Sequence, residues 1–302
     1  MPVLDEFTLL TLVFFCLIIF VSGLVHGSLG LGFPMLATPL LALSIDLQSA
    51  ILITLLPTAT VNTVSILRGG RWGESVGRFW PLSIYVVIGS AIGTSLIIAS
   101  DPAPFKLVLA ALILLYMGAG WLGRLRMGWV NRHRGWSMMA FGTSAGIAAG
   151  CTNVMVPVLI IYTLETGLAT TAMVQVFNMC FLAGKLTQMA VFAGTGMFGT
   201  ELLISTLPLA GVALIALLLG MALRERIASE TYRRSIKWIL FIVALIMIAQ
   251  YFLMYLSWSP IDIGLSDRLP VDRYATLGHR SGPAYHLQML QPVTSVDAYP
   301  AR

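Results

Sequence analysis

Charged residues are scarce in this chain. Asp, Glu, Lys and Arg make up 10% of the 302 residues, and hydrophobic residues make up 58%. A soluble domain usually carries about 25% charged residues. A globule with so little charge could not cover its surface with polar groups, whereas a protein that faces lipid does not need to. The composition therefore excludes an ordinary soluble protein and favours a membrane protein.

Cysteine is also rare, and the motifs of common enzymes are missing. Only three cysteines occur, all inside apolar runs and without metal-site spacing, so we interpret them as reduced packing residues: Cys16, Cys151 and Cys180. The chain has no nucleotide-binding glycine loop, no cluster of metal-binding histidines and no Gly-x-Ser-x-Gly nucleophile turn. These absences argue against an enzyme and predict no cofactor and no metal site.

The net charge of +5 does not indicate a nucleic-acid-binding protein, because the basic residues lie in short loops between apolar runs. The start of the chain is also unlike a signal peptide, since its first charges are Asp5 and Glu6 and a very long apolar run follows. The expected partners are the lipid bilayer and a small substrate, with a homodimer left open.

The apolar runs predict ten membrane segments. A span needs about 20 apolar residues, and a run of about 10–14 is more typical of a re-entrant or broken segment. The uncharged stretches after Glu6 and after Arg134 are each too long for one helix, and each is interrupted by glycines. The predicted segments are 7–29, 33–45, 47–67, 79–100 and 105–123, followed by 135–150, 153–165, 168–193, 201–222 and 238–257.

The loops predict the topology. Those at 68–78, 124–134 and 223–237 are basic, whereas the turns at 101–104 and 194–200 contain no Lys or Arg. With ten segments the basic loops share one face, which the positive-inside rule assigns to the cytoplasm. We therefore expect a multi-pass protein of the bacterial inner membrane with both termini on the non-cytoplasmic side. The predicted parts are a first transmembrane repeat (1–123), a cytoplasmic linker loop (124–134), a second repeat (135–257) and a polar C-terminal tail (258–302).

Two glycine-rich stretches recur at the same place in both halves. They read Gly23-x-x-x-Gly27-x-x-Gly30-x-Gly32 and Gly142-x-x-x-Gly146-x-x-x-Gly150, and each precedes a short apolar segment that ends near a lone carboxylate, Asp46 or Glu165. Because five segments per half is an odd number, the halves would insert in opposite orientations. The predicted fold is therefore an all-α, polytopic transmembrane helical bundle of two inverted-topology repeats with broken helices.

The glycines have two interpretations. Breaks at membrane depth would free backbone N–H groups, which form an anion site at the N-terminus of a half-helix without a basic side chain. Alternatively, the glycines pack two helices closely together. Recurrence before a short segment in both halves favours the break.

The chain resembles the sulfite exporter TauE/SafE family over about residues 8–257. The glycines carry this resemblance, together with Pro39-Leu40 in the first half and Pro157 in the second. The resemblance implies export or uptake of small sulfur-containing or carboxylate anions, including sulfite and organosulfonates. It implies no cofactor and no use of ATP.

Polar residues inside membrane segments are functional candidates. His26 could bind the anion or carry a coupled proton, or be a packing residue; Asn153 could bind the anion or cap a helix; Lys185 could neutralise the anion or extend outward from a helix end. The predicted substrate-binding residues are His26, Gly27, Ser28, Gly30, Gly32, Gly150, Cys151, Asn153, Asn62, Asn178 and Lys185, with His26 also the proton-coupling residue.

The breaks and the polar residues predict a secondary transporter that is coupled to protons and binds a small anion at the two breaks near mid-membrane. The resemblance implies that this anion contains sulfur, such as sulfite or an organosulfonate, and that it is exported. A passive anion channel and a transporter of a small carboxylate remain alternatives. Asp46 and Glu165 are rival proton carriers, although charged residues at segment ends are common.

Overall fold

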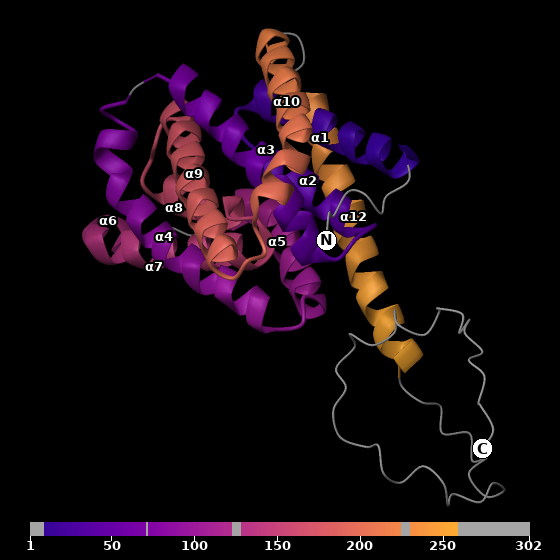
Figure 1. Cartoon of the computed structure of the whole chain (residues 1–302). Coiled ribbons are helices and arrows are strands. Elements are labelled where there is room, and N and C mark those ends of the chain that lie inside the picture. Colours follow the sequence, from indigo (N-terminus) through magenta and orange to yellow (C-terminus); the bar gives the residue numbers. More distant parts are fainter. Residues whose placement is uncertain (1–8, 71, 123–127, 225–229, 259–302) are drawn as a thin grey trace, which may run out of the picture. The chain divides into compact units, whose positions relative to one another are not determined.

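The structure, a computed structural model, describes residues 9–70, 72–122, 128–224 and 230–258 (Figure 1). The predicted C-terminal tail lies, after Trp258, outside the described residues. All described elements are helices. They are α1 (Leu9–Leu29), α2 (Phe33–Ala42), α3 (Leu47–Arg68), α4 (Val76–Ala99), α5 (Ala103–Leu122), α6 (Gly128–Arg132), α7 (Arg134–Thr152), α8 (Val156–Glu165), α9 (Thr170–Gly194), α10 (Thr200–Ala222) and α12 (Glu230–Trp258).

Each of the ten predicted segments corresponds to one of these helices. Within the described residues, α1, α3, α4, α9, α10 and α12 are long and apolar enough to cross a membrane. Helices α2 and α8 contain 10 residues each and are too short to cross, as the sequence predicts. The chain is therefore a polytopic helical membrane protein. The short helix α6 was not predicted and lies inside the expected linker loop.

The first predicted break is present between α1 and α2. Gly30 and Gly32 have φ of 81° and 113°, in the left-handed region that favours glycine. Helix α2 then begins at Phe33, with Pro34 in its first turn. Proline is tolerated there because the N–H groups of the first turn have no hydrogen-bond partner inside the helix. The glycines stop one helix, and the proline favours the start of the next.

The second break lies at the end of the predicted interruption, which was expected around Gly150 to Asn153. Helix α7 continues through Gly150 to Thr152, and the chain leaves the helix at Asn153, whose φ is 69°. Asparagine tolerates this conformation better than most residues other than glycine. Helix α8 begins at Val156, again with a proline, Pro157, in its first turn.

Most of the repeated glycines serve close helix packing. A side chain on Gly27 would collide with the Leu217 carbonyl of α10, and one on Gly146 would collide with the Val86 carbonyl of α4. A Cβ on Gly150 would lie 2.6 Å from the backbone nitrogen of Thr94, also in α4. The packing interpretation therefore applies to these glycines, and Gly150 remains helical because it lets α7 approach α4.

The helices of the two halves exchange partners. Helix α1 packs along α10, beside it in Figure 1, and α7 packs along α4. Similarly, α4 contacts α9 and α10 contacts α3, while α3 packs against α9 and α5 against α12. Each of these contacts has a counterpart if α1, α3, α4 and α5 are replaced by α7, α9, α10 and α12. This matching supports a repeat, and the opposite orientation of the halves stays a prediction.

Candidate functional site

Two central helices, α3 and α9, each carry a row of buried polar side chains. In both helices these residues recur at intervals of three or four positions or their multiples, which places them on one helix face. Since α3 packs against α9, the rows lie in the interior of the bundle. The residues, none more than 7% exposed, are Thr54, Thr58, Asn62 and Ser65 of α3, and Gln175, Asn178, Lys185 and Gln188 of α9.

The first break is held by both rows. The backbone N–H of Phe33, the first residue of α2, donates to Nδ1 of His26 at 3.3 Å. Because Nδ1 accepts, the proton of the neutral ring lies on Nε2, which donates to Oγ of Ser65 at 3.1 Å. From α9, Nδ2 of Asn178 donates to the Gly30 carbonyl at 3.0 Å. His26 thus caps α2 and connects the break to α3.

The second break is held in a corresponding way. Nδ2 of Asn153 donates to Oγ1 of Thr54 in α3 at 2.9 Å and to Oγ1 of Thr38 in α2 at 2.6 Å. From α9, Nε2 of Gln188 donates to the carbonyls of Ala149 and Gly150 in the last turn of α7, both at 3.1 Å. An amide from the second half thus joins its own break to two helices of the first half.

The order of these contacts fixes the direction of the two rows. The first break meets the C-terminal part of α3 and the N-terminal part of α9, where Gln175 donates to the Ile66 carbonyl at 3.0 Å. The second break meets the opposite ends of both helices. Helices α3 and α9 are therefore antiparallel, and Thr58, Asn62 and Lys185 lie along the stretch between the two breaks.

Lys185 is buried without a counter-charge. Its side chain is 1% exposed and donates to Oε1 of Gln188, a neutral group on the same helix. Among the described residues no carboxylate pairs with it. The alternative that Lys185 extends outward from a helix end is therefore wrong. Burying an ammonium group costs several kcal/mol unless a partner offsets it, so this position is suited to an incoming anion.

The comparison with known families agrees with this architecture. The family model described as sulfite exporter TauE/SafE matches residues 15–250, which is most of the chain. The chain belongs to the sulfite exporter TauE/SafE family. No curated protein and no solved structure matches it. Membership in TauE/SafE makes the protein a membrane transporter and not an enzyme, as the sequence predicts.

Within this TauE/SafE bundle, several predicted site residues make contacts other than those that hold the breaks. Gly27 lies in the crossing of α1 with α10, and Gly150 lies in the crossing of α7 with α4, with its carbonyl bonded to Gln188. Oγ of Ser28 donates to the Val25 carbonyl at 3.0 Å, and the Cys151 thiol to the Gly93 carbonyl of α4 at 3.3 Å. By contrast, Gly32 is buried at the start of α2, and a Cβ there would meet nothing within 4 Å. Of the predicted residues, the structure brings His26, Gly30, Gly32, Asn62, Asn153, Asn178 and Lys185 to the breaks and the rows between them.

Sequence reasoning missed Gln188, Thr38, Thr54 and Ser65, which hold the breaks. The regular spacing of polar residues along predicted spans was the available signal, since Thr54, Thr58, Asn62 and Ser65 share one helix face. The signal is weak, because threonine and serine often bond to their own helix backbone.

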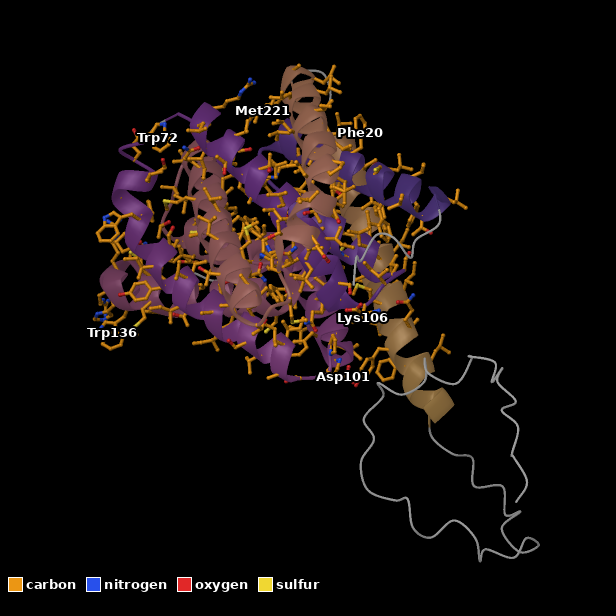
Figure 2. The ribbon with its side chains drawn as sticks, viewed as in Figure 1. Phe20, Trp72, Asp101, Lys106, Trp136 and Met221 are labelled. Atoms are coloured by element: carbon orange, nitrogen blue, oxygen red, sulfur yellow. The ribbon has the colours of Figure 1, made fainter. Side chains whose placement is uncertain are left out.

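The two candidate carboxylates lie away from the rows. Asp46 is exposed and caps α3, accepting the Ser49 N–H at 2.9 Å, and Glu165 is the last residue of α8. Asp46 and Lys106 also line a surface cavity of about 310 Å³ at the end of α2, together with Gln250 and Tyr251. Figure 2 shows Lys106 beside Asp101 at one end of the bundle, with Trp72 toward the opposite end.

Proposed function

We propose that this transporter exports a small sulfur-containing anion, such as sulfite or an organosulfonate, and binds it between Lys185 and the start of α8. The observation that carries the proposal is the buried side-chain nitrogen of Lys185, which has a neutral amide as its partner. An anion beside it would supply the missing counter-charge. The protein would lie in the bacterial inner membrane with its basic loops on the cytoplasmic side and both termini on the other side.

The start of α8 supports this position. Its N-cap residue is Met155, and a Cβ on Gly184, the neighbour of Lys185, would lie 3.3 Å from the Met155 side chain. The N-terminus of a helix carries partial positive charge and presents backbone N–H groups, both of which favour an anion. Lys185 and the helix end would therefore attract the same ligand.

His26 gives a route to proton coupling. Its Nδ1 accepts the Phe33 N–H and cannot do so once it carries a proton of its own. Protonation would therefore release the first N–H of α2 and place an imidazolium beside it, and both changes add positive charge to the buried rows that carry Lys185. By linkage, anion binding would favour protonation by the same free energy.

The geometry favours a carrier over a passive channel. Both breaks are tied by hydrogen bonds to α3 and α9, and the polar side chains between them are buried. A carrier needs such a closed state, in which the bound ligand meets neither side of the membrane. The alternative of a small carboxylate as substrate shares the same electrostatics, and only a ligand comparison separates the two.

The test uses the purified full chain in liposomes with radiolabelled sulfite inside or outside. We expect saturable flux and counterflow, with competition by organosulfonates that is stronger than competition by short carboxylates or sulfate. Non-saturable flux without counterflow would establish a channel. Stronger competition by a carboxylate would reassign the substrate, and no flux of any of these anions would refute the proposal.

A further inference from the structure

Thr58 differs from the other threonines of α3. Thr54, Thr60 and Thr63 each donate a hydrogen bond to the carbonyl four residues earlier, at 2.8, 2.9 and 2.8 Å. The Thr58 hydroxyl is fully buried, and no described residue gives it a hydrogen-bond partner. Its oxygen is therefore directed into the bundle and is not bonded to its own helix.

Asn62 places a second such oxygen one turn along α3. Its Nδ2 donates to the Thr58 carbonyl at 2.7 Å, so amide geometry holds Oδ1 within about 5 Å of that carbonyl. Oδ1 of Asn62 is buried, and the described part of the chain offers it no donor. The oxygens of Thr58 and Asn62 thus come from adjacent turns of one face of α3.

Asn178 adds a third oxygen from α9. Its Nδ2 donates to the carbonyls of Gly30 and Val174, both at 3.0 Å, which fixes the amide and leaves Oδ1 buried beside the His26 side chain. Gln175, one turn earlier, reaches the carbonyl of Ile66, one turn beyond Asn62. Because the helices are antiparallel, Asn178 lies at the level of Asn62. We call these three oxygens the acceptor cluster.

The acceptor cluster has the wrong chemistry for an anion. The lone pairs of the two amide oxygens would repel one, whereas a hard cation binds amide and hydroxyl oxygens well. The cluster contains no carboxylate to balance a divalent ion, and the described residues hold no group of three His, Cys, Asp or Glu side chains. Lys185 lies about two turns farther along α9 and would hold the anion there. The negative charge of that anion would attract a positive ion to the nearby acceptor cluster.

We propose that the acceptor cluster binds a sodium ion that is transported with, or exchanged for, the anion. This inference rests on the proposed transport function, because a sodium ion in this place would be the coupling ion of the anion site. In broken-helix transporters, neutral backbone carbonyl oxygens coordinate sodium, and the neutral side-chain oxygens of the acceptor cluster would act as such ligands.

The first test measures sodium directly and does not depend on the anion. Purified protein is titrated with radioactive ²²Na⁺, with unlabelled Na⁺, K⁺ and choline as competitors. We expect saturable binding that Na⁺ displaces and choline does not. We expect Thr58→Ala to weaken binding at least tenfold and Thr58→Ser, which keeps the hydroxyl, to preserve it. Thr60→Ala is the matched control, because its hydroxyl bonds to the Leu56 carbonyl of its own helix.

The second test measures sulfite flux in liposomes at fixed pH with sodium, potassium or choline as the only cation. The proposal expects flux to rise with sodium, and Thr58→Ala to raise the half-saturating sodium concentration at least tenfold. Equal flux in all three cations, or ²²Na⁺ binding that Thr58→Ala leaves unchanged, would show that water alone fills the cluster. Saturable sulfite flux in those same experiments would leave the proposed function standing.

Discussion

Lys185→Met separates a functional lysine from a structural one. An ammonium group has three N–H donors, of which Gln188 receives one, so two are left for an anion. A hydrogen bond to a charged group contributes about 1.5–3 kcal/mol. The loss of two such bonds amounts to about 3–6 kcal/mol, which is roughly a 10²- to 10⁴-fold weaker Kd.

The same substitution should leave the fold intact. Replacing a buried ion by an apolar side chain of similar volume is often neutral or stabilising by about 1–4 kcal/mol. Against this, Oε1 of Gln188 loses its donor, which costs about 1–3 kcal/mol. The two effects are similar in size, so Tm should change little. Loss of binding with an unchanged Tm is the pattern that marks Lys185 as an anion-binding residue.

The assay pairs binding with stability. Radiolabelled sulfite binding and thermal unfolding are measured on the same purified samples of wild type, Lys185→Met and Lys106→Met. Lys106 is the matched control, because it is a partly buried lysine that lines the surface cavity near Asp46. Wild-type affinity in Lys185→Met would refute the reasoning. A fall in Tm large enough for unfolding to explain the loss of binding would refute it as well.

Three further predictions follow from the breaks and crossings. Gly146→Val should prevent isolation of a monodisperse protein in size-exclusion chromatography, because the valine side chain would collide with α4. Gly135→Ala is the control and should behave like wild type, since a Cβ there meets nothing within 4 Å. A well-folded Gly146→Val would contradict the packing. Asn153→Ala and Asn153→Gly both lose the hydrogen bonds to Thr38 and Thr54, but only alanine is strained at φ 69°. The free energy of unfolding should therefore be lower in the alanine variant than in the glycine variant by about 1–2 kcal/mol. Equal Tm values for the two variants would argue against that strain. Wild-type flux should depend on pH, and His26→Gln should flatten that dependence; a full pH profile in the variant would remove His26 as the proton carrier.

The helices and the first break were predictable because their signals are local. Runs of apolar residues and the charges between them mark where a segment can cross the membrane, and Gly30 and Gly32 stop α1 where the sequence suggested. The exact position of the second break, at Asn153, was harder to predict from the sequence. A glycine such as Gly150 can either break a helix or let two helices cross closely. Only the approach of α4 to α7 decides between these roles.

The buried state of Lys185 could not be predicted from its position alone. A lysine inside a predicted span can extend its side chain to the membrane surface or point into the bundle. The choice depends on which face of α9 meets α3 and α7, and that face is set by residues far away in the sequence. The same holds for Gln188, whose contacts with the last turn of α7 have no local signature.

The exchange of packing partners has a consequence for biosynthesis. Helix α1 enters the membrane early, but its partner α10 begins about 170 residues after α1 ends. At a translation rate of about 5–20 residues per second, α1 waits roughly 10–35 s before α10 is made. During that interval the surface that carries Gly23 and Gly27 must face lipid or a membrane-insertion factor. A nascent chain arrested before α10 should therefore expose this surface to crosslinking, and release of the full chain should hide it.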